Sequence, residues 1–317
     1  MRILVTGAAG FIGSHLAEHL AGKGHDVRAV DCLTDNYALA LKDLNVHAVR
    51  EAGCAFFRRD LVRDALFDVL EDVEAIYHLA AQPGLSATVP FEAYVRNNIM
   101  ATHHLLKAAV EIPDLRAFIH ISTSSVYGAK ATGDEKTEPK PTSYYGVTKL
   151  AAEQLVMAAS RERGLPACCL RLFSVYGPRE RPEKLYPRLI RCLLEEREFP
   201  LFEGSEKHYR SYTYVDDIVV GMQAVLDHMP RCRGEIFNIG AGTAITTGEG
   251  IRIMEDLVGH KARIIIQPPR EGDQLETRAN IEKARRVLQY RPNTSALEGL
   301  SHELAWYREE VLGKVDL

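Results

Sequence analysis

The fold is decided by the stretch Arg2-Ile3-Leu4-Val5-Thr6-Gly7-Ala8-Ala9-Gly10-Phe11-Ile12-Gly13. A short apolar run that favours an extended strand leads directly into three glycines spaced three residues apart, and an amphipathic stretch follows. Glycines in such a turn let the backbone approach a pyrophosphate closely, and the N-terminus of the next helix then faces the phosphate charge. The spacing is G-x-x-G-x-x-G, not the more general G-x-G-x-x-G. The stretch predicts the start of a dinucleotide-binding domain, with an ordinary strand–turn–helix as the alternative.

The alternation of strand and helix continues through the first half of the chain. Apolar runs predict strands at Ile3–Thr6, Val27–Asp31, Ala55–Arg59, Ala75–Leu79, Phe118–Ser122 and Ala167–Phe173. Helices are predicted near Phe11–Gly22, Ala65–Leu70, Phe91–Val110 and Tyr145–Arg163. This order is typical of an α/β fold with a Rossmann-type, doubly wound parallel sheet and helices on both faces. Such sheets bind ligands at the carboxyl ends of their strands.

The pattern changes near Ser174, where Gly177-Pro178-Arg179-Glu180-Arg181-Pro182 interrupts the alternation. Shorter helices and strands follow. We therefore expect residues 1–173 to form the dinucleotide-binding domain and residues 174–317 a smaller C-terminal α/β substrate lobe. The run Phe237-Asn238-Ile239 is a segment that could rejoin the main sheet.

Composition excludes several classes of protein. The 317 residues are 46% hydrophobic and 26% charged, close to the average for soluble globular proteins. A net charge of −4 does not suggest a protein that binds nucleic acid. No apolar run reaches the length of about 18 residues that a membrane span needs. No secretion signal is recognisable, so we expect a cytoplasmic protein. Six cysteines without C-x-x-C spacing predict reduced thiols, with no metal site and no structural disulfide.

Asp31 ends the second predicted strand, eighteen residues after Gly13. A carboxylate at this position would accept hydrogen bonds from the adenosine ribose and repel a 2′-phosphate. Residues 32–35 contain no arginine or lysine, so the sequence favours NAD over NADP. The alternative is a turn residue at the end of a strand.

Three further segments are expected to contact the cofactor. Asp60-Leu61 and Leu79-Ala80-Ala81-Gln82 follow the third and fourth strands, and Asn97 lies on the next helix. Both loops lie at the carboxyl edge of the predicted sheet, where small residues would let the cofactor approach the backbone. Loop or helix packing alone is the alternative.

Tyr145 and Lys149 are the principal catalytic candidates. Their spacing places a phenol and an ammonium on one face of a helix, one turn apart. We expect the cation to lower the pKa of the tyrosine from its reference value of about 10, which suits a general base. The hydroxyl run Ser122-Thr123-Ser124-Ser125 ends a buried-looking strand shortly before the pair. Together with the glycine turn, this predicts hydride transfer between a nicotinamide and a sugar-like alcohol.

These motifs resemble the extended short-chain dehydrogenases/reductases, in the NAD-dependent sugar epimerase/dehydratase group, from Arg2 to about Tyr307. The resemblance is carried by residues 6–13, Asp31, Asp60-Leu61, Leu79-Ala80-Ala81, Val126-Tyr127-Gly128, Tyr145-x-x-x-Lys149, Leu170-Arg171-Leu172-Phe173, residues 210–217 and Pro269-Arg270-Glu271-Gly272-Asp273. It implies a tightly held NAD that is reduced and reoxidised within one turnover. It also implies a nucleoside-diphosphate sugar substrate and a homodimer built from two helices of each subunit.

The resemblance also assigns roles to residues. Tyr145 is the base, Lys149 its partner and a ligand of the nicotinamide ribose, and Thr123 the catalytic Ser/Thr. Cofactor contacts are implied for Gly7, Gly10, Phe11, Ile12, Gly13, Asp31, Asp60, Leu61, Leu79, Ala80, Ala81, Gln82, Asn97, Ser122, Tyr145, Lys149 and Phe173. Substrate contacts are implied for Pro83, Gly84, Thr123, Ser124, Ser125, Ser174, Arg181, Arg210 and Arg270. Arg210 and Arg270 would bind the diphosphate, with solvated surface charges as the alternative.

The hydroxyl run indicates the reaction. In related 4,6-dehydratases an Asp-Glu pair follows the threonine, and in related UDP-glucuronate decarboxylases a glutamate replaces Ser125. Ser124 and Ser125 supply no such acid, so oxidation at C4 and hydride return to the other face remain, which is 4-epimerisation.

The substrate is indicated by the same run and by residues 175–182, which together resemble UDP-glucuronate 4-epimerases. UDP-galactose 4-epimerases usually carry Ser-Ala-Thr in the run and Asn in place of Ser174. Arg181 stands where the subfamily holds the C6 carboxylate, with a loop charge as its alternative. Some members carry arginine in place of Ser86, so tolerance of neutral sugars stays open. The remaining alternatives are a UDP-galactose or UDP-N-acetylglucosamine 4-epimerase, a UDP-glucuronate decarboxylase and a non-catalytic NAD-binding regulator.

Overall fold

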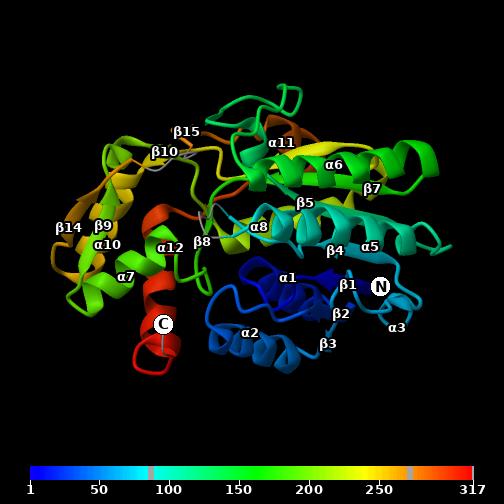
Figure 1. Ribbon diagram of the computed structural model, residues 1–317, viewed down its shortest axis with the longest axis horizontal. Coiled ribbons are helices and arrows are strands. Elements are labelled where there is room, and N and C mark those ends of the chain that lie inside the picture. The colour runs from blue at the N-terminus through cyan, green and yellow to red at the C-terminus, as the bar shows by residue number, and fades with distance from the viewer. Residues whose placement is uncertain (85–88, 270–273, 316–317) are drawn as a thin grey trace.

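The computed structural model describes residues 1–84, 89–269 and 274–315, and its largest element is a seven-stranded parallel sheet (Figure 1). The strand order is β12-β7-β5-β4-β1-β2-β3. These strands are β1 (Arg2–Thr6), β2 (Asp26–Asp31), β3 (Ala55–Arg58), β4 (Ala75–His78), β5 (Ala117–Thr123), β7 (Ala167–Leu172) and β12 (Ile236–Ile239). All six strand pairings are parallel, which confirms the predicted Rossmann-type α/β fold. The run around Phe237 does join this sheet, because β12 pairs with β7.

Helices cover both faces of the sheet because alternate residues of each buried strand point in opposite directions. Ile3 and Val5 of β1 face a core shared with α1 (Phe11–Gly22) and α8 (Val215–Asp227). Leu4 faces the opposite core, which contains residues of α3 (Phe67–Leu70), α5 (Ala101–Ala109) and α6 (Tyr144–Arg163). The adjacent residues Cys168 and Cys169 divide between the two cores in the same way, and all six cysteines are free thiols.

A third hydrophobic core lies mostly in the second half of the chain and contains Tyr176, Tyr186, Phe199, Met254 and Leu300, together with Leu41 of the first half. Figure 1 shows many of its elements gathered on the left, beside the large sheet. Besides α8 and β12, residues 174–317 contain β8 (Val175–Tyr176), α7 (Leu185–Leu194), β9 (Glu198–Phe202), β10 (Tyr209–Arg210), β11 (Thr213–Tyr214), α9 (Met229–Cys232), β13 (Ile245–Thr246), α10 (Thr247–Val258), β14 (Arg263–Gln267), β15 (Glu276–Thr277), α11 (Glu282–Leu288) and α12 (Ala296–Trp306). The buried residues of α9 and α11 belong to the core of the large sheet. A small sheet of order β13-β10-β15-β6 incorporates β6 (Lys130–Ala131) from the first half, so the two halves are interleaved.

Two helical regions differ from the sequence-based expectation. Helix α2 (Leu39–Glu51) was not predicted, because its buried face includes the polar Lys42 and Asn45 and its N-cap Ala38 gives no capping signal. The predicted helix Phe91–Val110 consists of α4 (Phe91–Tyr94), a π-helical turn over 95–100 and α5. Within the described residues, no helix combines the length and the apolar character needed to cross a membrane.

Candidate active site

Gly7 and Gly13, in the turn between β1 and α1, have no room for a side chain. Gly7 has φ +74°, and a Cβ there would lie 2.8 Å from the backbone nitrogen of Ala80. A Cβ on Gly13 would lie 2.1 Å from the carbonyl oxygen of Gly7. Helix α1 starts after Gly10, which provides no capping side chain, so the N–H groups of its first turn keep their capacity to bind an anion.

Asp31, at the end of β2, braces this turn. Its Oδ2 accepts a hydrogen bond from the backbone N–H of Ala9 at 3.1 Å, and its Oδ1 accepts one from Leu33 at 2.8 Å. The carboxylate therefore acts as a turn residue, and it also lines the cleft described next.

A cleft of about 1300 Å³ runs along the carboxyl ends of the sheet strands and into the second half of the chain. It brings together all the predicted site residues in the described part of the chain. From the first half these are Gly7, Gly10, Phe11, Ile12, Gly13, Asp31, Asp60, Leu61, Leu79, Ala80, Ala81, Gln82, Pro83, Gly84, Asn97, Ser122, Thr123, Ser124, Ser125, Tyr145 and Lys149. Phe173, Ser174, Arg181 and Arg210 complete the set. Arg270 and Ser86 lie outside the described residues.

The loop after β4 is fixed by buried hydrogen bonds. The Nδ1 of His78 lies 2.8 Å from Thr6 Oγ1, and its Nε2 lies 2.9 Å from Thr102 Oγ1. The hydroxyl of Thr102 donates to the backbone carbonyl oxygen of Asn98, so the Thr102 oxygen accepts a hydrogen bond from Nε2–H of His78. The Nδ1 of His78 then carries no proton and accepts a hydrogen bond from the Thr6 hydroxyl. The Oδ1 of Asn98 accepts the backbone N–H of Gln82 at 2.7 Å, which holds the small residues 80 and 81 at the edge of the cleft.

Tyr145 does not show the expected lowering of its pKa. Burial raises the pKa of its phenol, and the hydrogen bond with Thr123 and the positive charge of Arg181 offset this only in part. The Lys149 ammonium instead donates to the carbonyl oxygen of Ile121 at 2.5 Å and lies 3.5 Å from Nε2 of His120. Burial lowers the pKa of Lys149 to about 8. The expectation failed because a desolvated ammonium takes the nearest strong acceptor, here a carbonyl of β5.

A buried ion pair links the helix of Tyr145 and Lys149 to the sheet. Glu153, two turns beyond Tyr145 on α6, accepts from Arg171 of β7 through Nη2 at 2.6 Å and through Nε at 3.0 Å. Ser122 also donates to Glu153, at 2.7 Å, directly before Thr123 on β5. Both members of the pair are at least 98% buried. The pair therefore ties α6 to the two strands that end beside the cleft.

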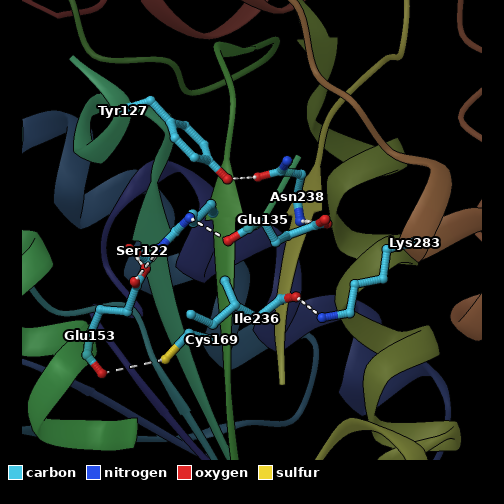
Figure 2. Close-up of polar contacts among 9 residues, drawn as sticks. Ser122, Tyr127, Glu135, Glu153, Cys169, Ile236, Asn238 and Lys283 are labelled. Atoms are coloured by element: carbon cyan, nitrogen blue, oxygen red, sulfur yellow. Dashed lines mark hydrogen bonds and ion pairs between the residues drawn. The ribbon is translucent and has the colours of Figure 1, made fainter. Parts of the chain in front are cut away.

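The same region anchors the loop that follows β5 (Figure 2). Tyr127 donates its hydroxyl proton to Asn238 Oδ1 at 2.8 Å, and the backbone N–H of Asn238 donates to Glu135 at 2.8 Å. The guanidinium of Arg171 lies over the Tyr127 ring, 4.8 Å from its centre. Asn238 of β12 thus holds this region at two points, Tyr127 and Glu135.

The second half of the chain contributes charged groups to the cleft. A Cβ on Gly84 would lie 2.9 Å from Arg181 Nη2, so the arginine packs directly against the loop after β4. Arg181 also pairs with Glu183, at 2.7 Å. Arg210 lies on β10, within the small four-stranded sheet. Gln274 donates to the carbonyl oxygen of Gly128 at 2.8 Å and so holds the loop between residues 128 and 142.

Sequence reasoning missed several residues that line the cleft. Arg96 pairs with Asp60 at 2.5 Å, directly beside the predicted Asn97. The others include Tyr37, Lys42, Arg59, Glu180, Lys184, Arg188, Phe202 and Gln274. Arg96 could have been found from its position next to Asn97, whereas Tyr37 and Lys42 belong to the region of the unpredicted helix and carried no signal.

The family model described as "NAD dependent epimerase/dehydratase family" matches residues 3–240. The chain belongs to this family. Among curated family relatives, it is 39% identical over 312 residues to the uncharacterized UDP-glucose epimerase YtcB of Bacillus subtilis strain 168, covering 96% of this chain and 98% of that one. It is 33% identical over 317 residues to a UDP-glucuronate 4-epimerase of Thermodesulfobacterium geofontis, covering 97% and 96%. The crystal structure of the Bacillus cereus UDP-glucuronic acid 4-epimerase with UDP-glucuronic acid and NAD matches with a TM-score of 0.93 and 38% identity, covering 98% of this chain and 99% of that one.

Proposed function

We propose that the protein is an NAD-dependent UDP-glucuronate 4-epimerase, an isomerase that interconverts UDP-glucuronate and UDP-galacturonate. The observation that carries this proposal is the position of Arg181, whose guanidinium packs on Gly84 in the same cleft as Thr123 and Tyr145. A guanidinium is a bidentate ligand for the C6 carboxylate that distinguishes a hexuronate from a neutral sugar. The substrates named for the Bacillus cereus and Thermodesulfobacterium relatives support this choice.

The cofactor is held by the first half of the chain. The glycine turn and the N-terminus of α1 bind the pyrophosphate of NAD, and Asp31 excludes a 2′-phosphate. Lys149 binds the nicotinamide ribose. When bound there, NAD would supply the hydride acceptor and donor for C4 of the sugar.

The chain's own side chains move and hold the proton. Tyr145 takes the proton of the C4 hydroxyl, and Thr123 hydrogen-bonds the same oxygen. Burial raises the pKa of Tyr145, and the hydrogen bond with Thr123 and the positive charge of Arg181 act in the opposite direction, which favours this role. After the 4-keto sugar turns, Tyr145 returns its proton to the new hydroxyl.

The residues around the sugar also protect the intermediate. A 4-keto uronate is a β-keto acid, which loses carbon dioxide readily. Arg181 and Ser174 hold its carboxylate in an orientation that disfavours C–C cleavage. At the two positions where related enzymes carry an acid, the cleft is bordered by the hydroxyls of Ser124 and Ser125.

Residues 1–173 bind NAD, and residues 174–317 form most of the substrate lobe, with Arg210 and Arg270 on the diphosphate. The protein is a cytoplasmic homodimer. Neutral UDP-sugars such as UDP-galactose are the second candidate substrates, because the Bacillus subtilis relative is named a UDP-glucose epimerase.

The decisive experiment incubates purified protein with UDP-glucuronate, without added NAD, and follows the sugar protons by NMR. We expect UDP-galacturonate to accumulate, and Tyr145→Phe to stop it. Arg181→Ala should lower turnover of UDP-glucuronate; unchanged turnover would contradict the carboxylate role. A UDP-pentose product would indicate a decarboxylase. Faster turnover of UDP-galactose would indicate a neutral-sugar epimerase, and bound NAD without turnover of any nucleotide sugar would indicate a regulator.

A further inference from the structure

The loop that carries Arg181 is fastened to helix α1 by the side chain of Arg179. Its Nη1 donates to Ser14 Oγ at 3.2 Å and pairs with Glu18, and its Nη2 donates to Glu18 Oε2 at 3.3 Å. Ser14 and Glu18 are one turn apart on α1, whose N-terminus opens into the cleft. The contact therefore joins the predicted carboxylate-binding loop directly to the predicted pyrophosphate-binding helix.

The backbone of this loop shows that the contact is specific. Arg179 has φ +70°, a left-handed conformation that a residue with a side chain adopts only under strain and that glycine adopts freely. Strained residues of this kind persist where the surrounding structure holds them, and they cluster at functional sites. The bonds from Arg179 to α1 are interactions that glycine could not make.

The tripeptide Arg179-Glu180-Arg181 is held in three directions. Arg179 reaches α1, whereas Glu180 is only 7% exposed and has a buried oxygen without a protein partner. Arg181 reaches the cleft and lies against Gly84. Tight turns lie on both sides of the tripeptide. The N–H of Glu180 donates to the Gly177 carbonyl and the N–H of Lys184 donates to the Arg181 carbonyl, each at 3.0 Å. These bonds restrict how far Arg181 can move relative to Arg179.

We propose that Arg179, held by Glu18 and Ser14, is a positioning residue that sets the place of the Arg181 guanidinium relative to the cofactor helix. It thereby determines how strongly the site prefers a sugar with a C6 carboxylate. This inference rests on the proposed function. A ligand without that carboxylate does not bind through Arg181, so its affinity should not depend on the contact of Arg179 with Glu18 and Ser14.

The test compares Arg179→Gly and Glu18→Gln with the wild type. Arg179→Gly removes the side chain and accepts the φ of +70° without strain, whereas Glu18→Gln keeps the backbone and removes the paired charge. We expect KM for UDP-glucuronate to rise about tenfold in Arg179→Gly, because a bidentate contact between Arg181 and the carboxylate depends closely on the position of the guanidinium. We expect kcat to stay within about twofold, because the charge of Arg181 acts on Tyr145 through space and this effect changes little with a small displacement. The inhibition constant of UDP, which lacks the carboxylate, should stay unchanged. Arg179→Lys should restore part of the loss.

The outcomes separate this inference from the proposed function. Wild-type protein without UDP-glucuronate turnover would reject the function, and the inference with it. An active wild type whose two variants keep its KM, or whose KM and UDP inhibition constant rise equally, would overturn the positioning role alone. Bound NAD and the melting temperature report on folding. If Arg179→Gly fails to fold, the KM of Glu18→Gln decides.

Discussion

The buried pair Arg171–Glu153 permits a quantitative test of what holds α6, the helix of Tyr145 and Lys149, in place. We consider the substitution Arg171→Met, which keeps an unbranched apolar chain but removes the guanidinium. Glu153 is fully buried and would lose both its hydrogen bonds from Arg171. Ser122 would be left as its remaining side-chain donor.

The expected cost follows from this desolvation. Removing one partner of a buried ion pair typically destabilises a protein by about 3–5 kcal/mol, because the other charge stays buried and uncompensated. Arg171→Met also loses the stacking of the guanidinium on Tyr127. In contrast, the double variant Arg171→Met/Glu153→Leu leaves no unpaired charge and should lie within about 1–2 kcal/mol of the wild type. The lost acceptor of Ser122 accounts for about 1 kcal/mol of that cost.

The assay is urea unfolding of the wild type, Arg171→Met, Glu153→Leu and the double variant, followed by tryptophan fluorescence. A matched control is Arg191→Met, which removes a partly exposed partner of Glu195 at 3.4 Å and should cost at most about 1 kcal/mol. An Arg171→Met cost no larger than that of Arg191→Met, or a double variant equal to the sum of the single ones, would refute the reasoning.

Two further predictions concern the cofactor turn and the buried lysine. Gly13→Ala should abolish retention of NAD during purification, because its Cβ would lie 2.1 Å from the Gly7 carbonyl oxygen. The control Gly22→Ala, whose Cβ meets nothing within 4 Å, should retain NAD. The absorbance spectrum of the purified protein reports the bound NAD. Burial lowers the pKa of Lys149 from 10.5 to about 8, so between these pH values the folded state binds fewer protons than the unfolded state. The stability of the wild type relative to Lys149→Met should therefore rise as the pH increases from 8 to 10.5, measured by melting temperature; a flat or falling difference would contradict the assignment.

The large sheet was predictable because its information is local. Each strand is a short apolar run with a turn or glycine at its end, and each such run of the first half lies in the sheet. Helix α2 was not predictable in the same way. Lys42 is buried because its ammonium bonds to Thr34 Oγ1 at 3.0 Å and to Asn36 at 2.8 Å, and Asn45 because it donates to the carbonyl oxygen of Ala9 at 2.9 Å. Those partners are known only after the chain has folded.

The residues that line the cleft were predictable for a different reason, whereas the contacts of their side chains were not. Motifs that follow strands of a parallel sheet must meet at one edge, so topology alone brings Asp31, Ala80 and Thr123 together. By contrast, the hydrogen-bond partner of a long side chain depends on where its terminal charged group is buried. Helical spacing placed Lys149 one turn from Tyr145, but the buried ammonium is bonded to the carbonyl oxygen of Ile121. The proposed role of Tyr145 as a base therefore depends on more than the spacing of the motif, because the charge that lowers the pKa of its phenol comes from Arg181, on a different part of the chain. Arg181 would then serve both the proton transfer and the choice of sugar. The position of the Arg181 loop therefore matters for both functions, and the spacing of Tyr145 and Lys149 carries no information about it.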